Sequence, residues 1–238
     1  MNTPSDLEAA RQAVLARIRA AETAAGRAPG SVKLVAVSKT FPAEDIRALY
    51  ARGQRDFGEN YIQEWAAKAE ALSGCPEIVW HVIGQVQSNK SRAVAEHAHW
   101  LHTLDRVKLA KRLSAQRPAH LPDLQVLLEI NIANEAAKHG IRPEEMLPLA
   151  RTVAALPRLN LRGLMCVAQA DADAAQLAHQ FGQMRALLAG LQTVAPQADT
   201  LSMGMSADME AAVAAGATMV RVGSAIFGCR AKPQLSVK

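Results

Sequence analysis

The chain has 238 residues, of which half are hydrophobic and 21% are charged, so it can bury a sizeable core and is not disordered as a whole. Aromatic residues make up only 4%, which is too few for a surface that stacks nucleic-acid bases. The net charge is +5, but the cations are scattered, and the tightest cluster, Lys108 to Arg112, is typical of a solvated helix face.

The sequence also argues against several locations and classes. No apolar run approaches the 18 residues of a membrane span, and the first 20 residues lack the apolar stretch of a signal peptide. The three cysteines, Cys75, Cys166 and Cys229, are odd in number and far apart, which disfavours a disulfide framework or a zinc ribbon. We therefore expect a cytoplasmic protein with no membrane and no nucleic acid among its partners.

Helical spacing of apolar residues opens the chain over residues 8–24, and glycine and proline residues end that helix before residue 31. A valine-rich run over 32–39 then predicts a strand that is buried on both faces. This strand and helix unit recurs with a mean step of about 27 residues, the length of a strand, a crossover helix and two short loops. Strands are predicted over 32–39, 56–60, 78–84, 100–105, 124–131, 161–167, 200–205 and 219–223, and helices over 43–52, 61–72, 88–97, 106–116, 143–155, 173–191 and 207–215.

Eight such strands predict an α/β fold, a closed (β/α)8 TIM-type barrel preceded by an extra N-terminal helix. An open doubly wound sheet is disfavoured because the turn after the first strand, SKTFP, contains no glycine. No linker interrupts the pattern, so residues 1–238 are predicted to form a single domain.

The most informative residue is Lys39, at the end of the first predicted strand. Strand side chains alternate, so Val35, Val37 and Lys39 share one face. If the valines point into the barrel, Lys39 lies at its mouth, where the working face of such barrels is found. A partly desolvated lysine there can act as a nucleophile or form a Schiff base. From position alone, a strand-end lysine that simply reaches solvent is the alternative.

The eighth predicted strand places Arg221 on the same face as Met219 and Gly223. An arginine inside a barrel needs an anionic or acceptor partner, because an unpaired buried charge is costly. That partner is either an internal carboxylate such as Glu129 or a group on a ligand, such as a ring nitrogen or a carboxylate.

Small residues and serines follow the seventh and eighth strands, in the segments 202–206 and 223–224. Loops after these two strands customarily bind phosphate in such barrels. The backbone N–H groups of Gly223 and Ser224 are favoured for that role. Ser206 is expected instead to cap the next helix, whose first turn is acidic.

Other residues give weaker evidence of a functional role. His97 and His99 have no carboxylate or cysteine at ligand spacing, so a surface role is favoured over a metal site, and no metal is predicted. His81 is expected to be a hydrogen-bonded interior histidine, and Met203 and Met205 to be packing residues. No serine, histidine and aspartate set has local support.

Several segments resemble a known family. LVAVSKTFP, FGENYIQE, WHVIGQVQSNK, MCVA and LSMGMSADMEAAVAAGATMVRVGSAIFG are similar to the YggS/PROSC-type pyridoxal phosphate homeostasis proteins, and the match runs from about Val32 to Gly228. The segment 138–140 also matches the KxG that this family carries after the fifth strand. The sequence departs from the family at Val82 and Val86, where phenylalanine and leucine are usual.

The resemblance implies a fold similar to the barrel domain of alanine racemase and pyridoxal 5′-phosphate (PLP, a form of vitamin B6) as the cofactor. It implies that Lys39 carries the aldimine and that Arg221 faces the pyridine nitrogen. The phosphate is assigned to Ser202, Gly223 and Ser224, and the lining of the pocket to Asn60, Met203 and Gly204.

An arginine beside the ring nitrogen disfavours its protonation and so weakens the ring as an electron sink. Related racemases add a second domain with a tyrosine base, whereas the tyrosines of this chain are Tyr50 and Tyr61. We therefore expect a PLP carrier or buffer in intracellular PLP homeostasis, without turnover, with apo PLP-dependent enzymes as candidate recipients and a monomer favoured over a dimer. The alternatives are a minor PLP-dependent racemase or decarboxylase and, from another class, a basic barrel that binds nucleic acid or a protein.

Overall fold

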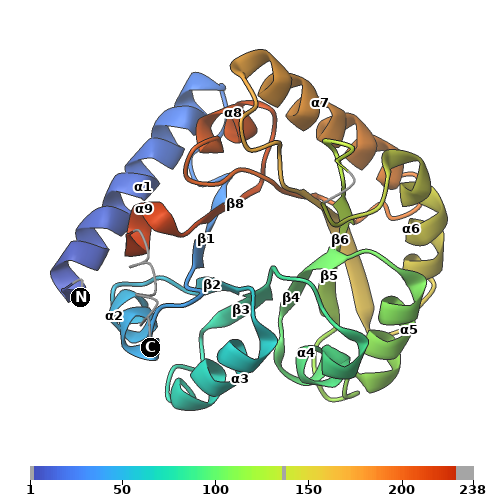
Figure 1. Ribbon diagram of the computed structural model, residues 1–238, viewed down its shortest axis with the longest axis horizontal. Coiled ribbons are helices and arrows are strands. Elements are labelled where there is room, and N and C mark those ends of the chain that lie inside the picture. The colour runs from blue at the N-terminus through green and yellow to red at the C-terminus, as the bar shows by residue number, and fades with distance from the viewer. Residues whose placement is uncertain (1–2, 136–137, 229–238) are drawn as a thin grey trace, which may run out of the picture.

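Within the residues that the computed structural model describes, 3–135 and 138–228, eight parallel strands close into a barrel (Figure 1). Each strand pairs with the next along the chain, and the last pairs with the first. The predicted fold class, a (β/α)8 barrel with an extra N-terminal helix, is confirmed. The strands are β1 (Lys33–Val37), β2 (Asp56–Glu59), β3 (Val79–Val82), β4 (Trp100–Leu104), β5 (Leu124–Ile130), β6 (Leu159–Cys166), β7 (Thr200–Ser202) and β8 (Met219–Val222).

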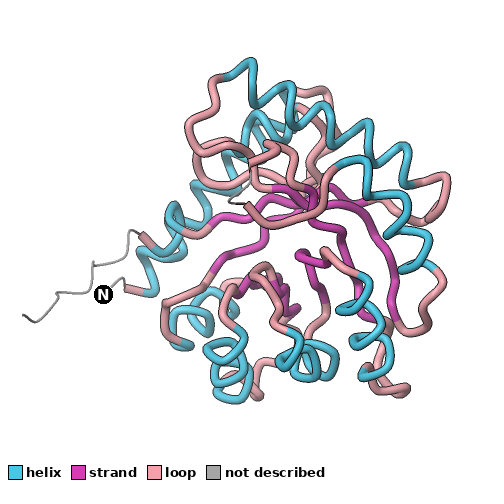
Figure 2. Tube along the Cα trace, turned by 45° about the vertical axis from the view of Figure 1, so that its right-hand side comes forward, coloured by secondary structure: helices cyan, strands magenta, loops and turns pink. Residues whose placement is uncertain are grey.

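Helices cover the outside of the barrel, and Figure 2 shows them in cyan around the magenta strands. No helix in the described part of the chain is long and apolar enough to cross a membrane. The helices are α1 (Pro4–Ala24), α2 (Ala43–Ala51), α3 (Ile62–Ala71), α4 (Ser91–His97), α5 (Val107–Gln116), α6 (Met146–Ala154), α7 (Ala174–Leu191), α8 (Met209–Ala214) and α9 (Ser224–Phe227), with short 3-10 turns η1 (Ser88–Lys90) and η2 (Pro143–Glu145).

The largest difference between predicted and observed elements follows β7. This strand is predicted over 200–205 but ends at Ser202. Gly204 has a φ of +95°, a conformation that glycine adopts readily and other residues do not, and a Cβ there would come within 2.6 Å of the Ala212 Cβ. The chain therefore turns away from the sheet at this point. Helix α9 is not predicted, because four residues are too few to show a helical period.

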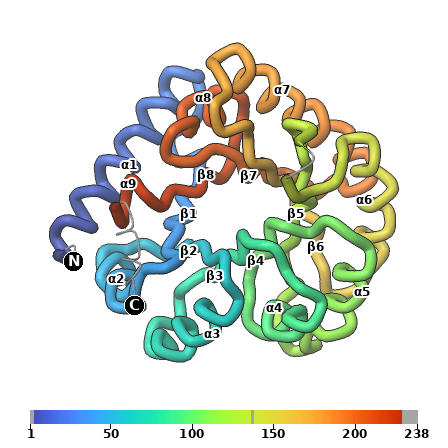
Figure 3. The backbone as a smooth tube through the Cα atoms, in the orientation of Figure 1, coloured from blue at the N-terminus to red at the C-terminus, as the bar shows by residue number. Residues whose placement is uncertain are grey.

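The N-terminal helix α1 covers the outer face of the barrel beside β8. Thr3 and Asp6 form a reciprocal capping box at its start. Its apolar stripe of Leu7, Val14 and Ile18 is buried, and the helix packs against α2, α8 and α9 (Figure 3). Because α9 has only four residues, α1 supplies the apolar cover that a full-length helix after β8 would otherwise provide.

Side chains along the strands alternate between two apolar clusters. Leu34 and Ala36 of β1 belong to the cluster shared with the helices, whereas Val35 belongs to the cluster inside the barrel, as the alternation predicts. The interior cluster fills the barrel, so the fold encloses a packed core and not a pore. Its buried members are Val35, Trp100, Leu127, Met165 and Met219.

Candidate functional site

A cavity of about 670 Å³ opens at the carboxyl ends of the strands. Met165 belongs both to the interior apolar cluster and to the cavity lining, so the cavity lies directly above the packed part of the barrel. This end carries the site in (β/α)8 barrels. The lining residues are Val37, Lys39, Phe41, Asn60, Ile83, Glu129, Met165, Val167, Met205, Ser206, Ala207, Arg221, Gly223, Ser224 and Gly228.

Lys39 lies in this cavity, half-buried, two residues beyond the end of β1. Val37 lines the same cavity, so the predicted alternation of side chains extends to the lysine. Thr40 then has a φ of +68°, and the Phe41 N–H donates to the Ser38 carbonyl at 3.0 Å. This tight turn directly after Lys39 keeps the lysine at the mouth of the barrel.

The buried side chain of Lys68, on α3, stabilises the turn that follows Lys39. Its Nζ donates to the Ser38 carbonyl at 2.8 Å and forms ion pairs with Glu59 at 2.8 Å and Glu64 at 2.6 Å. The Ser38 Oγ donates to the same Glu59 oxygen at 2.7 Å, and the Glu64 carboxylate accepts the Thr40 N–H. One side chain thus ties α3 to the ends of β1 and β2.

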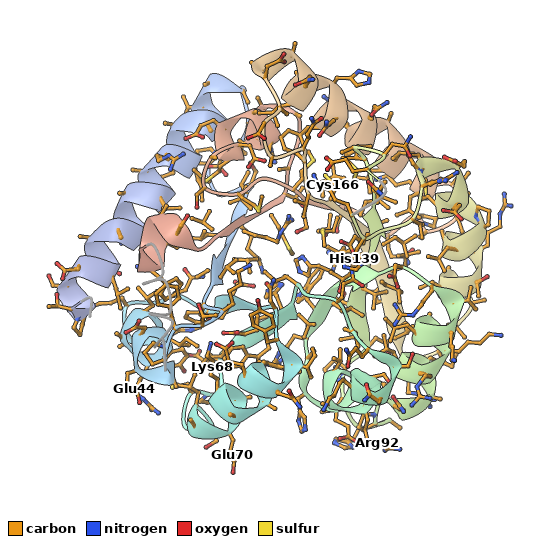
Figure 4. All side chains as sticks on the ribbon, viewed as in Figure 1. Glu44, Lys68, Glu70, Arg92, His139 and Cys166 are labelled. Carbon is orange, nitrogen blue, oxygen red and sulfur yellow. The ribbon has the colours of Figure 1, made fainter. Side chains whose placement is uncertain are left out.

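This cluster around Lys68 lies next to the cavity and does not line it. Lys39 directly follows Ser38, and Asn60 directly follows Glu59, so two cavity residues are positioned by their chain neighbours. Figure 4 shows Lys68 on the side of α3 that faces the barrel. Sequence reasoning missed this cluster because a lysine in a helix is ordinarily solvated.

Arg221 reaches the cavity from β8 and is only 5% exposed. Its Nη1 donates to the Ser202 Oγ at 2.7 Å and its Nη2 to the Cys166 carbonyl at 2.9 Å. Glu129 lines the same cavity, but the described structure has no ion pair between these two side chains. Burial lowers the pKa of Arg221, yet arginine stays charged in proteins, so a positive charge faces the cavity.

The loops after β7 and β8 meet at one wall of the cavity. Ser206 and Ser224 both line it, and their hydroxyl oxygens lie 3.2 Å apart. Gly223 lies beside them, and a Cβ there would come within 3.1 Å of the Val37 carbonyl oxygen. From α1, the Arg17 Nη2 donates to the Ser206 carbonyl at 3.0 Å. Two hydroxyls and the N–H groups at the start of α9 form a set of donors suited to an anion.

Asn60 brings an acceptor to the cavity. Its Oδ1 is buried and has no hydrogen-bond partner among the described residues, although buried polar atoms are ordinarily paired. A Cβ on Gly84 would lie 2.1 Å from the Asn60 carbonyl oxygen, so only glycine permits this approach of the two backbones. This unmet acceptor on a residue that lines the cavity is a candidate contact for a ligand.

Glu129 is the titratable acid of the cavity. Its carboxylate accepts a hydrogen bond from the Gln85 Nε2, and burial raises the pKa of Glu129 to about 7 in spite of that bond and of Arg221. An acid that titrates near neutral pH can take up or release a proton in the cavity. The sequence analysis considered Glu129 only as a partner for Arg221. The available signal was its strand phase, which it shares with the interior residue Leu127.

Three predicted site residues lie outside the cavity lining. Ser202, expected to contact the phosphate, is fully buried, and its hydroxyl hydrogen-bonds with Arg221 and His102 instead of lining the cavity. Met203 is buried in the cluster between strands and helices, and Gly204 makes the turn after β7. Both are structural, and the expectation that they line the pocket is corrected.

The expectations for residues 205 and 206 are also wrong. The N-cap of α8 is Asp208 and not Ser206, and the Asp208 carboxylate accepts the Met205 N–H at 2.6 Å. Ser206 therefore lines the cavity, and Met205, 39% exposed, lines it too instead of packing in the core. An aspartate two residues after the serine was the signal that a second capping residue was present.

Histidines outside the cavity divide into buried and exposed ones. His81 is buried and hydrogen-bonded, as predicted. His97 and His99 are exposed, and the described residues contain no group of three or more side chains that could hold a metal. Cys75 and Cys166 are free and buried, while Cys229 lies outside the described residues.

Comparison with known proteins defines the class of this barrel. Residues 10–231 match the family described as alanine racemase, N-terminal domain. The chain is 52% identical over 217 residues to the pyridoxal phosphate homeostasis protein of Pseudomonas aeruginosa, which covers 91% of this chain and 93% of that protein. It is also 52% identical over 216 residues to the protein of the same name from Escherichia coli strain K12, covering 90% and 92%. The chain belongs to the family of the pyridoxal phosphate homeostasis proteins.

Solved structures agree with this assignment. PipY of Synechococcus elongatus is 38% identical, with a TM-score of 0.80 without PLP and 0.79 with PLP bound; each covers 90% of this chain and 99% or 100% of that chain. An unknown protein from Bifidobacterium adolescentis is 35% identical, with a TM-score of 0.89, covering 94% and 95%. Alanine racemase from Corynebacterium glutamicum, at 18% identity and a TM-score of 0.68, covers 95% of this chain and 63% of that one. That last likeness shows the fold alone.

Proposed function

We propose that this chain binds PLP through a Schiff base to Lys39 and takes part in intracellular PLP homeostasis as a carrier or buffer, without catalytic turnover. The observation that carries the proposal is a single cavity in which a half-buried lysine, a buried arginine and two serine-bearing loops converge. The names of the relatives and the PLP-bound form of PipY support the same ligand.

The cavity offers a complementary group for each polar part of PLP. The Lys39 amine suits the aldehyde, and Arg221, a donor only, suits an unprotonated ring nitrogen. For the phosphate we propose Ser206, Gly223 and Ser224, which replaces Ser202 of the sequence-based prediction by the serine that lines the cavity. When bound, PLP supplies an electron sink whose strength depends on protonation of its ring nitrogen.

The position of Arg221 supports a carrier over a catalyst. A guanidinium beside the ring nitrogen disfavours protonation of that nitrogen, since two positive charges would adjoin. The ring would then stabilise a carbanion poorly. We therefore propose that a cytoplasmic, monomeric protein passes PLP to apo PLP-dependent enzymes or lowers free PLP when it is in excess.

A second candidate, slow PLP-dependent racemisation or a related activity, is favoured by one observation. Glu129, whose pKa burial raises to about 7, lines the same cavity as Lys39. Racemisation needs one group to remove the α-proton and another to return it, and these two side chains could serve. The carrier proposal is preferred because Arg221 weakens the electron sink whichever base is present.

Reduction of PLP-loaded protein with borohydride tests the covalent link. The pyridoxyl group should be found on the peptide that contains Lys39, and Lys39→Ala should lose the visible absorbance of the bound cofactor. Lys138→Ala is the matched control, because Lys138 lines a neighbouring pocket that shares Glu129, and it should keep the label. A label on Lys138 or Lys90 in the wild type would contradict the assignment.

Exchange of the α-hydrogen of alanine or serine in deuterated water separates carrier from enzyme. We expect negligible exchange by the fully loaded protein, together with transfer of PLP to an added apo-enzyme. Exchange at rates typical of enzymes, lost in both Lys39→Ala and Glu129→Gln, would favour the second candidate.

A further inference from the structure

A chain of hydrogen-bonded side chains crosses the barrel interior below the cavity. It runs from Arg221 on β8 through Ser202 on β7, His102 on β4 and His81 on β3 to Asp56, the first residue of β2. The successive donor–acceptor distances are 2.7, 2.9, 2.9 and 2.9 Å. The two imidazoles and the serine are completely buried. Barrel interiors are ordinarily filled by branched apolar side chains, so five linked polar groups call for an explanation.

The two ends of this hydrogen-bonded chain, Arg221 and Asp56, lie at opposite faces of the barrel. Arg221 lines the cavity at the carboxyl ends of the strands. Asp56 begins its strand at the other face, where it also pairs with Lys33 at 3.1 Å, a side chain that is 45% exposed. The hydrogen-bonded chain therefore connects the cavity with the opposite face of the barrel, where the strands begin.

The chemistry of the groups dictates the direction of every bond. Burial alone would raise the pKa of Asp56, but the hydrogen bond from His81 and the nearby Lys33 outweigh it and hold the pKa below its ordinary value. Asp56 is thus an ionised, acceptor-only group, and the His81 Nε2 must carry a proton. Burial lowers the pKa of both His81 and His102, which favours the neutral form with one proton in each ring.

The remaining proton positions follow. The His81 Nδ1 has no proton and accepts from the His102 Nε2–H. The His102 Nδ1 then accepts from the Ser202 hydroxyl, whose oxygen accepts from the Arg221 Nη1. Every donor points from the guanidinium towards the carboxylate, and such aligned bonds polarise and strengthen one another.

We propose that this one-way chain positions the Arg221 guanidinium for the pyridine nitrogen of the ligand, with Asp56 at the opposite end of the barrel as its anchor. The inference rests on the proposed function, because a ring nitrogen in the cavity is what gives the orientation of Arg221 its purpose. Asp56, His81, His102 and Ser202 are positioning residues, since none of them lines the cavity.

The hydrogen-bonded chain also keeps the Asp56 carboxylate out of direct contact with the Arg221 guanidinium. A carboxylate in direct contact would pair with the guanidinium and compete with the ligand. Three neutral groups stand between Arg221 and Asp56, so the carboxylate can fix the direction of the hydrogen bonds without occupying the donors of the cation. The guanidinium is pinned at two nitrogens, by Ser202 and by the Cys166 carbonyl.

Loss of the anchor would allow the chain to reverse. Without an acceptor at residue 56, His81 can move its proton to Nδ1 and donate to the His102 Nε2, and His102 then donates from Nδ1 to the Ser202 oxygen. The Ser202 oxygen, which has two lone pairs, would then accept from both His102 and Arg221, and the serine proton would lose the acceptor that now orients the hydroxyl. The orientation of Arg221 would be less well fixed as a result.

Histidine tautomers in the ligand-free protein test the direction of the chain. Two-dimensional spectra of protein labelled with ¹⁵N at histidine, assigned with His81→Gln and His102→Gln, should show both rings neutral near neutral pH and protonated on Nε2. A proton on Nδ1 in either ring, or a doubly protonated ring, would overturn the proposal.

Removal of the anchor should disturb both rings although only one of them touches it. In Asp56→Ala the Nε2–H population of His81 should fall, and that of His102 should fall with it. The matched control is Asp199→Ala, which removes the carboxylate directly before β7, where it forms an ion pair with Arg162. It should leave both rings unchanged. An unchanged His102 in Asp56→Ala would show that the groups do not act as one chain.

Binding of two ligands distinguishes a loss of Arg221 positioning from a general distortion of the cavity. Affinities are measured for PLP and for its 1-deaza analogue, in which a C–H group replaces the ring nitrogen. Asp56→Ala should weaken PLP binding about threefold to tenfold, as expected for coupling through a hydrogen-bond network, and leave the affinity of the analogue unchanged. An equal loss for both ligands, or no loss for PLP, would overturn the proposal.

Ser202→Ala cuts the chain next to Arg221 and serves as the second variant if Asp56→Ala does not fold. It should show the same PLP-selective loss, and the double variant should lose no more than the larger single loss, because both changes break one chain. Additive losses would contradict a shared role. A wild-type protein that binds neither ligand overturns the proposed function, while the tautomers of the ligand-free protein decide on the chain separately.

Discussion

Lys68 and Arg221 are both cations buried beside the same cavity, yet their surroundings differ. The Lys68 Nζ forms ion pairs with Glu59 and Glu64, so its charge is neutralised where it lies. Among the described residues, Arg221 donates only to neutral oxygens, on β6 and β7, and its side chain lines the cavity. A buried charge without a direct counter-ion is costly. Of these two cations, Arg221 is the one that carries this cost.

The difference separates a cation that holds the structure from one that is available to a ligand. Lys68 fixes the chain on either side of the turn after Lys39 through backbone and carboxylate contacts. Glu129 lines the same cavity as Arg221, but burial raises the pKa of Glu129 to about 7, so a large share of this acid is protonated near neutral pH. The charge of Arg221 is consequently available to a group that enters the cavity.

The largest expected effect is on stability, from Lys68→Met. The substitution leaves Glu59, whose pKa burial already raises, without its cation, and a broken buried pair costs about 3–5 kcal/mol. Urea denaturation of the ligand-free protein measures the loss. Lys111→Met, at an exposed position of α5, is the control and should change stability by less than about 0.5 kcal/mol. A loss below about 1 kcal/mol at Lys68 would contradict its structural role.

Arg221→Gln should act mainly on the ligand. The amide can still donate to the Ser202 oxygen, so the loss of stability should be smaller than that of Lys68→Met, about 1–2 kcal/mol. The affinity for PLP should fall about 10-fold to 100-fold, the value of a hydrogen bond from a charged group, as measured by titration with PLP. If the affinity were unchanged and the stability loss matched that of Lys68→Met, Arg221 would be a structural cation like Lys68.

Glu129→Gln tests whether the cavity acid leaves Arg221 unpaired. The folded-state pKa of about 7 lies above the ordinary value of 4.5, so the folded state binds this proton more tightly than the unfolded chain does. The resulting stability is fully present below the unfolded pKa and is lost as the pH rises through about 7. Glutamine mimics the protonated acid, so the variant should gain on the order of 1–2 kcal/mol over the wild type between about pH 5 and 8.

Urea denaturation of the ligand-free protein at several pH values measures this difference. Glu70→Gln, at an exposed position of α3, is the control for replacing a carboxylate by an amide and should change stability by less than about 0.5 kcal/mol. If Glu129→Gln instead lost stability relative to the wild type as the pH rose, the carboxylate would be paired with Arg221, and the contrast between the two cations would fail.

Thr40→Gly should have the smallest effect and tests how firmly the cluster around Lys68 holds the turn. Thr40 has a φ of +68°, which costs a non-glycine residue on the order of 1 kcal/mol, while glycine loses more backbone freedom on folding. We expect a stabilisation of less than about 1 kcal/mol by urea denaturation. Thr152→Gly, in helix α6, should destabilise, because glycine is a poor helix former. A clear destabilisation at Thr40 would show that the turn carries no strain.

The sequence by itself determined the barrel architecture and the placement of two residues of the site, Lys39 and Arg221. A mean step of about 27 residues between the predicted strands predicts the barrel, and strand alternation puts Lys39 and Arg221 on the inner face, where both line the cavity. These predictions succeed because period and phase are local properties, which follow from the backbone geometry of each strand and helix. The family motifs then pointed to the ligand.

Only the tertiary structure decided which side chains meet. Ser206 and not Ser202 lines the cavity because Gly204 turns the chain after β7 and Asp208 takes the capping position. The bond between His102 and Ser202 joins residues 100 positions apart. No local period encodes such a contact, since it depends on the closure of the barrel and on the register between strands. The chain of polar groups that leads to Arg221 is therefore visible only once the eight strands have closed around it.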